Sequence, residues 1–397
     1  MNGNARAIGL IAGQDIVLLG GGDWDLCPRE PDLLTVLAPH GNRVLFLESA
    51  GMRRPDFHVQ DLRRIVARLG RAREGMKDRG PGIHVISPLT IPLPDLALAR
   101  AVNVWIQRWA LHRAMRRLAF RDPILWVTSP LFEPLIERIP AKLVIYDCFD
   151  EWTAFPGVDA ALFGRLEARA IRRSDLVLAA SQQLVEAKRG LRPDVRLLRN
   201  GVHVERFQGS EPPEPADLAG IPRPRIGYVG NIYGRLDLAG LEALARARPD
   251  WSLVLVGLVR TPIDSLAALP NVHVLGHRPK ALVSDYLRHL DVGVVAHVPS
   301  ALADRQDPTK IYEYLAAGLP VVTTDLPAIE PFGPWVRRVP FGGDWAAAIA
   351  AELAADAPDA RRARREEASR HSWEARARDL SGWIEEALAA KRRAPHA

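Results

Sequence analysis

The sequence predicts an α/β protein with two Rossmann-like domains, each built on a parallel sheet, and a cleft between them. First, 397 residues exceed what one ordinary hydrophobic core holds. Second, short runs of Val, Ile and Leu alternate with helical patterns from end to end, as in parallel sheets covered on both faces. Third, the segment Gly209–Pro224 carries five prolines and interrupts this alternation, which is typical of an interdomain linker.

The N-terminal domain is expected over residues 1–208 and the C-terminal domain over 225–371, with 209–224 as the linker. Residues 372–397 are expected to form a final helix. The predicted strands share a short, apolar, β-branched pattern. In the first domain they are Asp15–Leu19, Arg43–Leu47, Ile83–Ile86, Ile124–Thr128, Leu143–Tyr146, Leu176–Ala179 and Arg196–Leu198. In the second they are Ile226–Val229, Ser252–Val256, Val272–Leu275, Val292–Val295, Val321–Thr323 and Val336–Val339.

The composition is that of a globular protein, with 48% hydrophobic and 25% charged residues. No apolar run approaches the ~20 residues of a membrane-spanning helix. The first residues also lack the basic, apolar and small-residue pattern of a signal peptide. Cys27 and Cys148 have no metal-ligand or redox spacing. We therefore expect a soluble, cytoplasmic protein.

The chain is basic, with a formal net charge of +6. Solvated helix faces are one interpretation of this charge. A phosphate-rich partner, such as the anionic inner face of the membrane or a lipid diphosphate, is another. Nucleic acid is disfavoured, because no basic stripe is interleaved with aromatic residues. The basic clusters are Arg63, Arg64, Arg68, Arg71, Arg73 and Lys77, and Arg113, Arg116, Arg117 and Arg121.

The segment Leu96–Phe120 is amphipathic. Trp105, Trp109 and other apolar residues alternate with several arginines at helical spacing. The segment is expected to be a helix that covers the core of the first domain, and contact with a membrane surface is the alternative.

The segment Asp307–Val322 is the most informative for function. Its pattern predicts a short helix with Asp307 as the N-cap and Pro308 as the first helical residue. Gly318 is expected to end the helix in the left-handed conformation, and Pro320 prevents its continuation. The free N–H groups at the start of such a helix favour a phosphate.

Lys310 lies in the first turn of this predicted helix, and Glu313 follows three residues later on the same face. An ammonium group and a carboxylate beside an anion site suit a nucleotide, because one binds the diphosphate and the other accepts from ribose hydroxyls. A plain intrahelical Lys–Glu pair on a surface helix is the alternative. The position after the fourth strand of the second domain favours the nucleotide.

This segment resembles the signature of retaining GT-B glycosyltransferases of family 4 (glycosyl transferases group 1), a Glu-x7-Glu motif followed by Gly-x-Pro-Val-Val. Glu313 matches the second glutamate, which in that family holds the donor ribose, whereas Arg305 stands at the position of the first. The chain resembles a bacterial subgroup with a Pro-x-Lys-x-x-Glu-Tyr-Leu-Ala helix. The resemblance covers nearly the whole chain and implies a GT-B fold, in which the final helix, residues 372–397, crosses back to the first domain.

The segment from Ile226 to Asp237 resembles the first strand and phosphate loop of the family's donor domain. Gly230 would let the backbone approach a ligand, and Arg235 would add a phosphate contact, unless it is a surface arginine. The strand and loop from Asn271 to Pro279 resemble those that cover the donor base, on which His277 or Arg278 could stack; a solvent-exposed loop is the alternative. The resemblance therefore implies a set of donor-binding residues, namely Gly21, Gly22, Gly230, Asn231, Gly257, His277, Arg278, Thr309 and Glu313.

In the first domain, a glycine-rich loop precedes Asp23 and Trp24 and follows the first strand, where it can approach a diphosphate or the transferred sugar. Two rival interpretations exist. Asp23 and Asp25 imitate the metal-binding Asp-x-Asp of GT-A transferases. The glycines, with Glu48 ending the second strand, imitate a dinucleotide-binding fingerprint, although Asp25 stands where the third glycine belongs.

A carboxylate cluster ends the strand at Leu143–Tyr146. The resemblance suggests that Asp150 orients the acceptor hydroxyl or receives its proton, while Asp147 lies on the acceptor side with Asp23 and Trp24. A structural role is the alternative for both aspartates. The expected catalytic residues are therefore Asp150, Lys310 and Arg235, with no metal ligand and no cofactor.

The resemblance implies a hexosyltransferase-type enzyme that moves a sugar from a nucleotide-diphosphate donor to an acceptor hydroxyl with retention and without a metal. The acceptor would be a glycan, a lipid-linked intermediate or a small molecule. Biosynthesis of cell-surface polysaccharide, glycolipid or secondary metabolites is the expected context. A GT-B nucleotide-sugar epimerase and a non-catalytic partner protein with the same fold are the alternatives.

Overall fold

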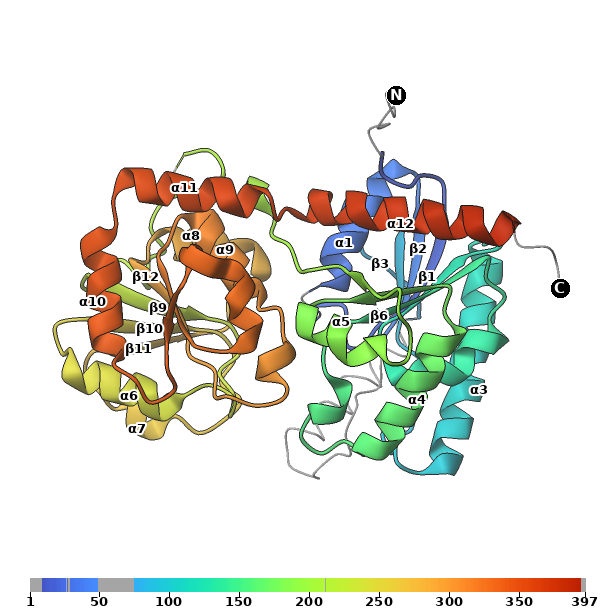
Figure 1. Ribbon diagram of the computed structural model, residues 1–397, viewed down its shortest axis with the longest axis horizontal. Helices are drawn as coiled ribbons and strands as arrows, with labels where there is room; N and C mark the ends of the chain where they lie inside the picture. Colours follow the sequence, from blue (N-terminus) through green and yellow to red (C-terminus); the bar gives the residue numbers. More distant parts are fainter. Residues whose placement is uncertain (1–8, 26, 28, 49–74, 211, 394–397) are drawn as a thin grey trace. The chain divides into compact units, whose positions relative to one another are not determined.

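The structure, a computed structural model, describes residues 9–25, 27, 29–48, 75–210 and 212–393. The predicted basic cluster Arg63–Arg73 lies outside the described residues. The chain divides into two compact units, each an α/β layer structure (Figure 1). The N-terminal unit contains Met1–Arg199 together with Trp373–Ala397, and the C-terminal unit contains Asn200–Ser372.

The N-terminal unit is built on an eight-stranded sheet in the order β3-β4-β2-β1-β5-β6-β7-β8. All neighbouring strands pair in parallel except β3, which is antiparallel to β4. The strands are β1 (Asp15–Leu19), β2 (Arg43–Leu47), β3 (Lys77–Asp78), β4 (Ile83–Ile86), β5 (Ile124–Val127), β6 (Leu143–Cys148), β7 (Leu176–Ala179) and β8 (Arg196–Leu197).

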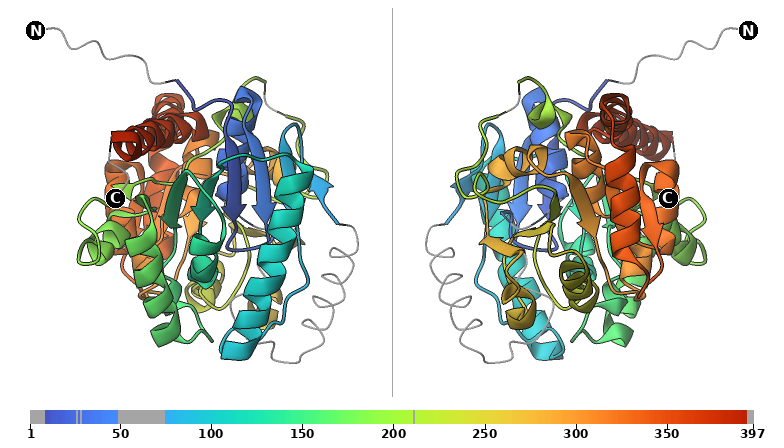
Figure 2. Two further views of the ribbon diagram at one scale, coloured as in Figure 1. Left: turned by 90° about the vertical axis from the view of Figure 1, so that its right-hand side faces the viewer. Right: turned by 90° about the vertical axis from the view of Figure 1, so that its left-hand side faces the viewer.

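Helices cover both faces of this sheet, because side chains along each strand point alternately to opposite faces. One face packs on α1 (Glu30–Leu37) and α12 (Trp373–Arg393). The other face packs on α3 (Ala97–Arg117), α4 (Ala160–Arg173), α5 (Gln182–Arg189) and the 3₁₀ segment η2 (Pro130–Arg138). Figure 2 shows α3 on the outside of this unit.

The C-terminal unit is built on a six-stranded parallel sheet in the order β11-β10-β9-β12-β13-β14. Its strands are β9 (Arg225–Val229), β10 (Ser252–Val256), β11 (Val272–Gly276), β12 (Val292–Val295), β13 (Val321–Thr324) and β14 (Arg337–Val339). Helices α6 (Leu238–Ala247), α7 (Asp264–Ala267) and α10 (Trp345–Ala355) are on one side. Helices α8 (Val283–Arg288), α9 (Thr309–Ala317) and α11 (Pro358–Ser369) are on the other.

The predicted α/β class with two parallel sheets is confirmed, and all thirteen predicted strands are present with ends that differ by at most two residues. The sequence analysis missed β3, a two-residue edge strand. Lys77 and Asp78 have no apolar character, so no hydrophobic pattern marks them.

The boundaries of the two units differ from the predicted domain limits. The predicted first domain ended at residue 208, but the C-terminal unit begins at Asn200. The predicted linker lies in the C-terminal unit, because Leu218 and Ile221 are buried in its core. The final helix, α12, packs in the N-terminal unit.

Within the described ranges, the structure contains no helix long and apolar enough to cross a membrane.

Candidate functional site

The centre of the C-terminal sheet is a topological switch point. The chain starts at β9 and builds outward through β10 and β11, and later returns to place β12 on the other side of β9. In open α/β sheets, ligands bind beyond the carboxyl ends of the strands at such a point. The residues that follow β9 and β12 are therefore the first place to look for a site.

Two glycines bring the backbone close together at the ends of β9 and β10. Gly230 has φ +145° and Gly257 has φ +153°, a region that residues with a side chain rarely adopt. A Cβ added to Gly257 would lie 1.9 Å from the carbonyl oxygen of Gly230, and one added to Gly230 would lie 2.3 Å from Cε of Lys310. Both positions require glycine. At Gly230 the missing side chain also leaves the space that Lys310 occupies.

Helix α9 places Lys310 beside Gly230. The backbone N–H of Val229 donates to the hydroxyl of Tyr314 at 2.9 Å, which fixes the helix against the end of β9. The ammonium nitrogen of Lys310 then lies 5.5 Å from the ring centroid of Tyr228. Burial alone would lower the pKa of Lys310, but neighbouring tyrosine oxygens and the Glu313 carboxylate outweigh it and raise the pKa. The side chain is therefore a cation at neutral pH.

The start of α9 differs from the predicted cap. Pro308, not Asp307, occupies the N-cap position, and no side chain caps the helix there. The Asp307 carboxylate instead accepts from the N–H of Asn200 at 2.5 Å and from the hydroxyl of Tyr312 at 2.9 Å. Sequence reasoning could not anticipate a partner more than 100 residues away. The predicted end of the helix is confirmed, since Gly318 has φ +83°.

A second cation approaches Lys310 from the loop after β9. The N–H of Val298 donates to the carbonyl of Arg235 at 2.8 Å, which joins this loop to the segment after β12. The guanidinium of Arg235 lies 4.5 Å from the ring centroid of Tyr233. Its charge is close enough to oppose the protonation of Lys310. Arg235 and Lys310 thus bring two positive charges near the carboxyl end of β9.

His297 follows β12 and lies beside these two cations. It is only 6% exposed, and within the residues that the structure describes its Nε2 makes no hydrogen bond. Burial first, and then the charges of Lys310 and Arg235, lower the pKa of His297 to about 3. The imidazole is therefore neutral and offers a hydrogen-bonding nitrogen near two positive charges.

The remaining predicted donor residues of this unit lie around the same strand ends. Thr309 is the first residue of α9 and Glu313 lies one turn later; both are half-buried. Asn231 is exposed, and its carbonyl accepts from the hydroxyl of Tyr228 at 3.0 Å. These positions agree with a site at the carboxyl edge of the sheet, but their roles stay predictions.

The loop after β11 holds the two residues predicted to cover the donor base. His277 is exposed. Arg278 donates from Nε to the hydroxyl of Tyr286 at 2.7 Å and forms an ion pair with Asp217. The guanidinium also donates to the carbonyl of His277 at 2.9 Å, so stacking on a base would require it to exchange three partners of its own unit.

In the N-terminal unit, the glycine-rich loop after β1 meets the end of β6. A Cβ added to Gly21 would lie 3.1 Å from the indole of Trp152 and 3.2 Å from the ring of Phe149. Phe149 and Trp152 pack edge to face with centroids 5.1 Å apart. A Cβ added to Gly22 would lie 3.3 Å from the sulfur of Cys27. The sheet also switches direction at β1 and β5, so this loop lies at the expected ligand edge.

The two residues after these glycines differ in burial. Asp23 is half-buried. Trp24 is 8% exposed and packs edge to face on Phe46, and its backbone N–H donates to the Glu48 carboxylate at 2.8 Å. Asp25 is exposed and forms an ion pair with Arg79 at 2.7 Å. Trp24 therefore contributes to the core beneath the loop.

The two aspartates at the end of β6 lie in different surroundings. Asp147 is fully buried and accepts two hydrogen bonds of 3.2 Å from the guanidinium of Arg29. Arg29 also donates to the carbonyl of Leu198 at 2.8 Å. Asp150 is half-buried, and its carbonyl accepts from the Cys148 thiol at 3.5 Å. Of the two, only Asp150 has a side chain that reaches the surface.

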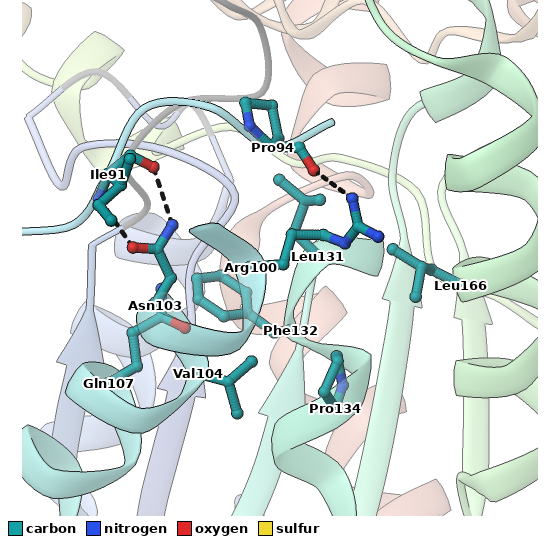
Figure 3. A pocket seen from close by; sticks show the side chains of 10 residues that line it. All are labelled: Ile91, Pro94, Arg100, Asn103, Val104, Gln107, Leu131, Phe132, Pro134 and Leu166. Carbon is teal, nitrogen blue, oxygen red and sulfur yellow. Dashed lines mark hydrogen bonds between the residues drawn. The ribbon is translucent and has the colours of Figure 1, made fainter. Parts of the chain in front are cut away.

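A small pocket of the N-terminal unit lies between α3, η2 and α4 (Figure 3). Phe132 and Leu166 are among its apolar walls. Two of its polar side chains bind the backbone: Asn103 pairs with the N–H and carbonyl of Ile91, and Arg100 donates to the carbonyl of Pro94 at 2.8 Å. None of the predicted site residues lines this pocket.

Sequence reasoning missed two residues that matter here. His297 could have been found, because it comes two residues after a buried strand, where ligands bind in this fold class. Arg29 carried no such signal, because only the tertiary structure brings it to Asp147.

Comparisons with known proteins relate this chain to glycosyltransferases. Residues 223–352 match the family model described as glycosyl transferases group 1, and this segment contains every site residue of the C-terminal unit discussed above. The chain is 32% identical over 221 residues to TuaH of Bacillus subtilis (strain 168), whose name assigns it to teichuronic acid biosynthesis as a glycosyltransferase. That alignment covers 51% of this chain and 56% of the length of TuaH.

Solved structures are similar over almost the whole chain. Sucrose-phosphate synthase from Thermosynechococcus elongatus has a TM-score of 0.70 at 18% identity, covering 95% of this chain and 100% of that one. Anabaena HepE in complex with UDP-glucose has a TM-score of 0.61 at 14% identity, covering 94% and 99%. The fold is therefore of the GT-B class, and the comparisons together support a glycosyltransferase.

Proposed function

We propose that this protein is a retaining glycosyltransferase of family 4, which transfers a sugar from a nucleoside-diphosphate sugar to an acceptor hydroxyl. The observation that carries the proposal is the pair of cations, Lys310 and Arg235, at the switch point of a glycosyl transferases group 1 domain. A departing diphosphate develops negative charge, and preorganised cations that meet this charge lower the barrier.

In the proposed reaction, the bond between the anomeric carbon and the diphosphate oxygen breaks while the acceptor oxygen bonds to the same carbon on the same face. The diphosphate leaves with the electron pair, which Lys310 and Arg235 stabilise. His297, held neutral, would donate to or accept from the donor without adding charge. Asp150 would orient the acceptor hydroxyl or receive its proton.

We expect activity without a divalent metal, because in the proposed site Lys310 and Arg235 would supply the positive charge that a metal otherwise brings to the diphosphate. An excess of EDTA should leave the initial rate of sugar transfer unchanged. Complete loss of activity with EDTA, restored by Mn²⁺ or Mg²⁺, would instead support Asp23 and Asp25 as metal ligands.

Replacing Glu313 with glutamine should weaken donor binding more than it slows the reaction. In the proposed role the carboxylate accepts from two ribose hydroxyls, and charge-assisted hydrogen bonds contribute ~1.5–3 kcal/mol each. We expect the donor KM to rise about tenfold or more, with kcat nearly unchanged. The matched control is Glu330→Gln, an exposed glutamate of the same unit. A large fall in kcat at constant KM would reject the ribose role.

The substrates and the location belong to the same proposal. The name of TuaH suggests an acceptor in cell-surface polysaccharide synthesis, and the UDP-glucose bound to HepE suggests a UDP-sugar donor. A lipid-linked intermediate or a small molecule is the other acceptor class. We propose a cytoplasmic enzyme that contacts the inner face of the membrane through basic helices of the N-terminal unit.

A thermal-shift screen with UDP-, GDP- and dTDP-sugars tests the donor, because a ligand that binds the folded state raises the melting temperature. Transfer is then measured as nucleoside diphosphate released together with acceptor-linked sugar. Sugar epimerised without an acceptor would favour an epimerase. Donor binding without any turnover would favour a non-catalytic partner protein.

A further inference from the structure

One helix of the N-terminal unit exposes a cluster of large apolar side chains. Among the described residues ten large hydrophobic side chains are exposed, and six of them lie between positions 89 and 109. Leu98 is 78% exposed, Trp105 68% and Trp109 58%. Contiguous exposed apolar residues on a folded unit mark an interaction surface more often than isolated ones do. The six are Leu89, Ile91, Leu96, Leu98, Trp105 and Trp109.

Three of these side chains share one face of α3. Leu98, Trp105 and Trp109 are separated by seven and four residues, which places them in one row along the helix. The opposite face packs on the core through Leu111 and Ala114. The row therefore points away from the unit, in keeping with the outer position of α3 in Figure 2.

The charge on α3 has a single sign. The helix contains five arginines and neither aspartate nor glutamate. Arg108 and Arg113 are exposed beside the tryptophans, and the guanidinium of Arg113 lies 5.8 Å from the ring centroid of Trp109. Arginine and tryptophan together suit the boundary of an anionic bilayer, where the cations meet phosphates and the indoles enter the headgroup region.

A second copy of the chain fits this face less well. In a symmetric dimer the same patch faces itself, so the arginines of one α3 would lie against those of the other. Like charges set against each other in this way oppose association. The charge pattern therefore favours an anionic lipid surface as the partner.

We propose that the exposed face of α3, formed by Leu98, Trp105 and Trp109 with the flanking arginines, docks the protein on an anionic membrane surface. The inference rests on the membrane contact in the proposed function and names the surface that makes it. Membrane docking does not require sugar transfer. Either proposal can therefore fail while the other holds.

The test is co-sedimentation of the full chain with vesicles of phosphatidylglycerol or of phosphatidylcholine alone. We expect binding to the anionic vesicles, weak binding to the zwitterionic ones, and release as salt screens the arginines. The double substitution Trp105→Ser/Trp109→Ser should weaken binding to anionic vesicles at least about tenfold. The control Phe341→Ser changes an exposed aromatic residue of the C-terminal unit and should leave binding unchanged.

Two further measurements keep the test decisive. The double variant should retain its melting temperature and its stabilisation by a nucleotide sugar, since both tryptophans are exposed and neither belongs to the donor site. Equal vesicle binding by wild type and double variant would overturn the proposal, as would no binding to anionic vesicles. A wild-type dimer that the double substitution dissociates, measured by sedimentation velocity, would show that a second copy is the partner.

Discussion

Replacing Lys310 with alanine is expected to lower kcat about 100- to 1000-fold while the protein stays folded. This range is typical for removal of one preorganised electrostatic contact to a developing charge. The ammonium lies beside Gly230 at the switch point and keeps its proton. Because charge on the leaving diphosphate grows toward the transition state, the loss should appear in kcat more than in KM.

Two variants separate this role from simple packing. Lys310→Met keeps most of the aliphatic length beside Gly230 but removes the charge, and it should be as inactive as the alanine variant. Lys310→Arg should recover little, because a planar guanidinium does not fit where a compact ammonium does. Lys280→Ala, at an exposed lysine of the same unit, is the control. A folded Lys310→Ala protein with more than about a third of the wild-type kcat would refute the assignment.

The fold was largely predictable because its strands are buried on both faces. Runs such as Asp15–Leu19 and Ser252–Val256 are fully buried, so their sequences are almost continuously apolar. The same logic failed at β3, whose two residues are polar, and at Gly209–Pro224. There the prolines suggested a linker, whereas Leu218 and Ile221 anchor the segment in the C-terminal core.

The candidate site was predictable only for residues whose positions follow from the predicted strands and helices. Gly230 directly follows β9, Arg235 lies in the next loop and Lys310 lies in the first turn of α9, and the structure places them near one another. The partners of Asp307, by contrast, come from tertiary contacts that no local pattern records. For His297 the sequence pattern predicts the position after β12, but it does not predict that the side chain is buried beside two cations.

Replacing Asp147 with alanine should lower the free energy of unfolding by ~3–5 kcal/mol, because it leaves the guanidinium of Arg29 buried without its carboxylate. The two side chains are 0% and 1% exposed and make two hydrogen bonds of 3.2 Å. Glu30 also lies close by. Burial raises the pKa of Glu30, and the charge of Asp147 raises it further. Removing Asp147 removes one cause of this rise, so Glu30 ionises more readily beside Arg29 and offsets part of the loss; the lower end of the range is therefore expected.

Urea unfolding of four proteins separates this structural role from a direct role in acceptor binding. The double variant Arg29→Met/Asp147→Leu should recover most of the lost stability, since apolar residues of similar size often replace a buried ion pair at little cost. Asp25→Ala breaks the exposed pair with Arg79 and should cost at most about 1 kcal/mol. If the single variant Asp147→Ala were as stable as wild type but had a raised KM for the acceptor, Asp147 would contact the acceptor, as the sequence first suggested. If instead the stable double variant regains transfer activity, the Asp147 carboxylate serves the fold of the N-terminal unit, and Asp150 remains the residue proposed to orient the acceptor hydroxyl or receive its proton.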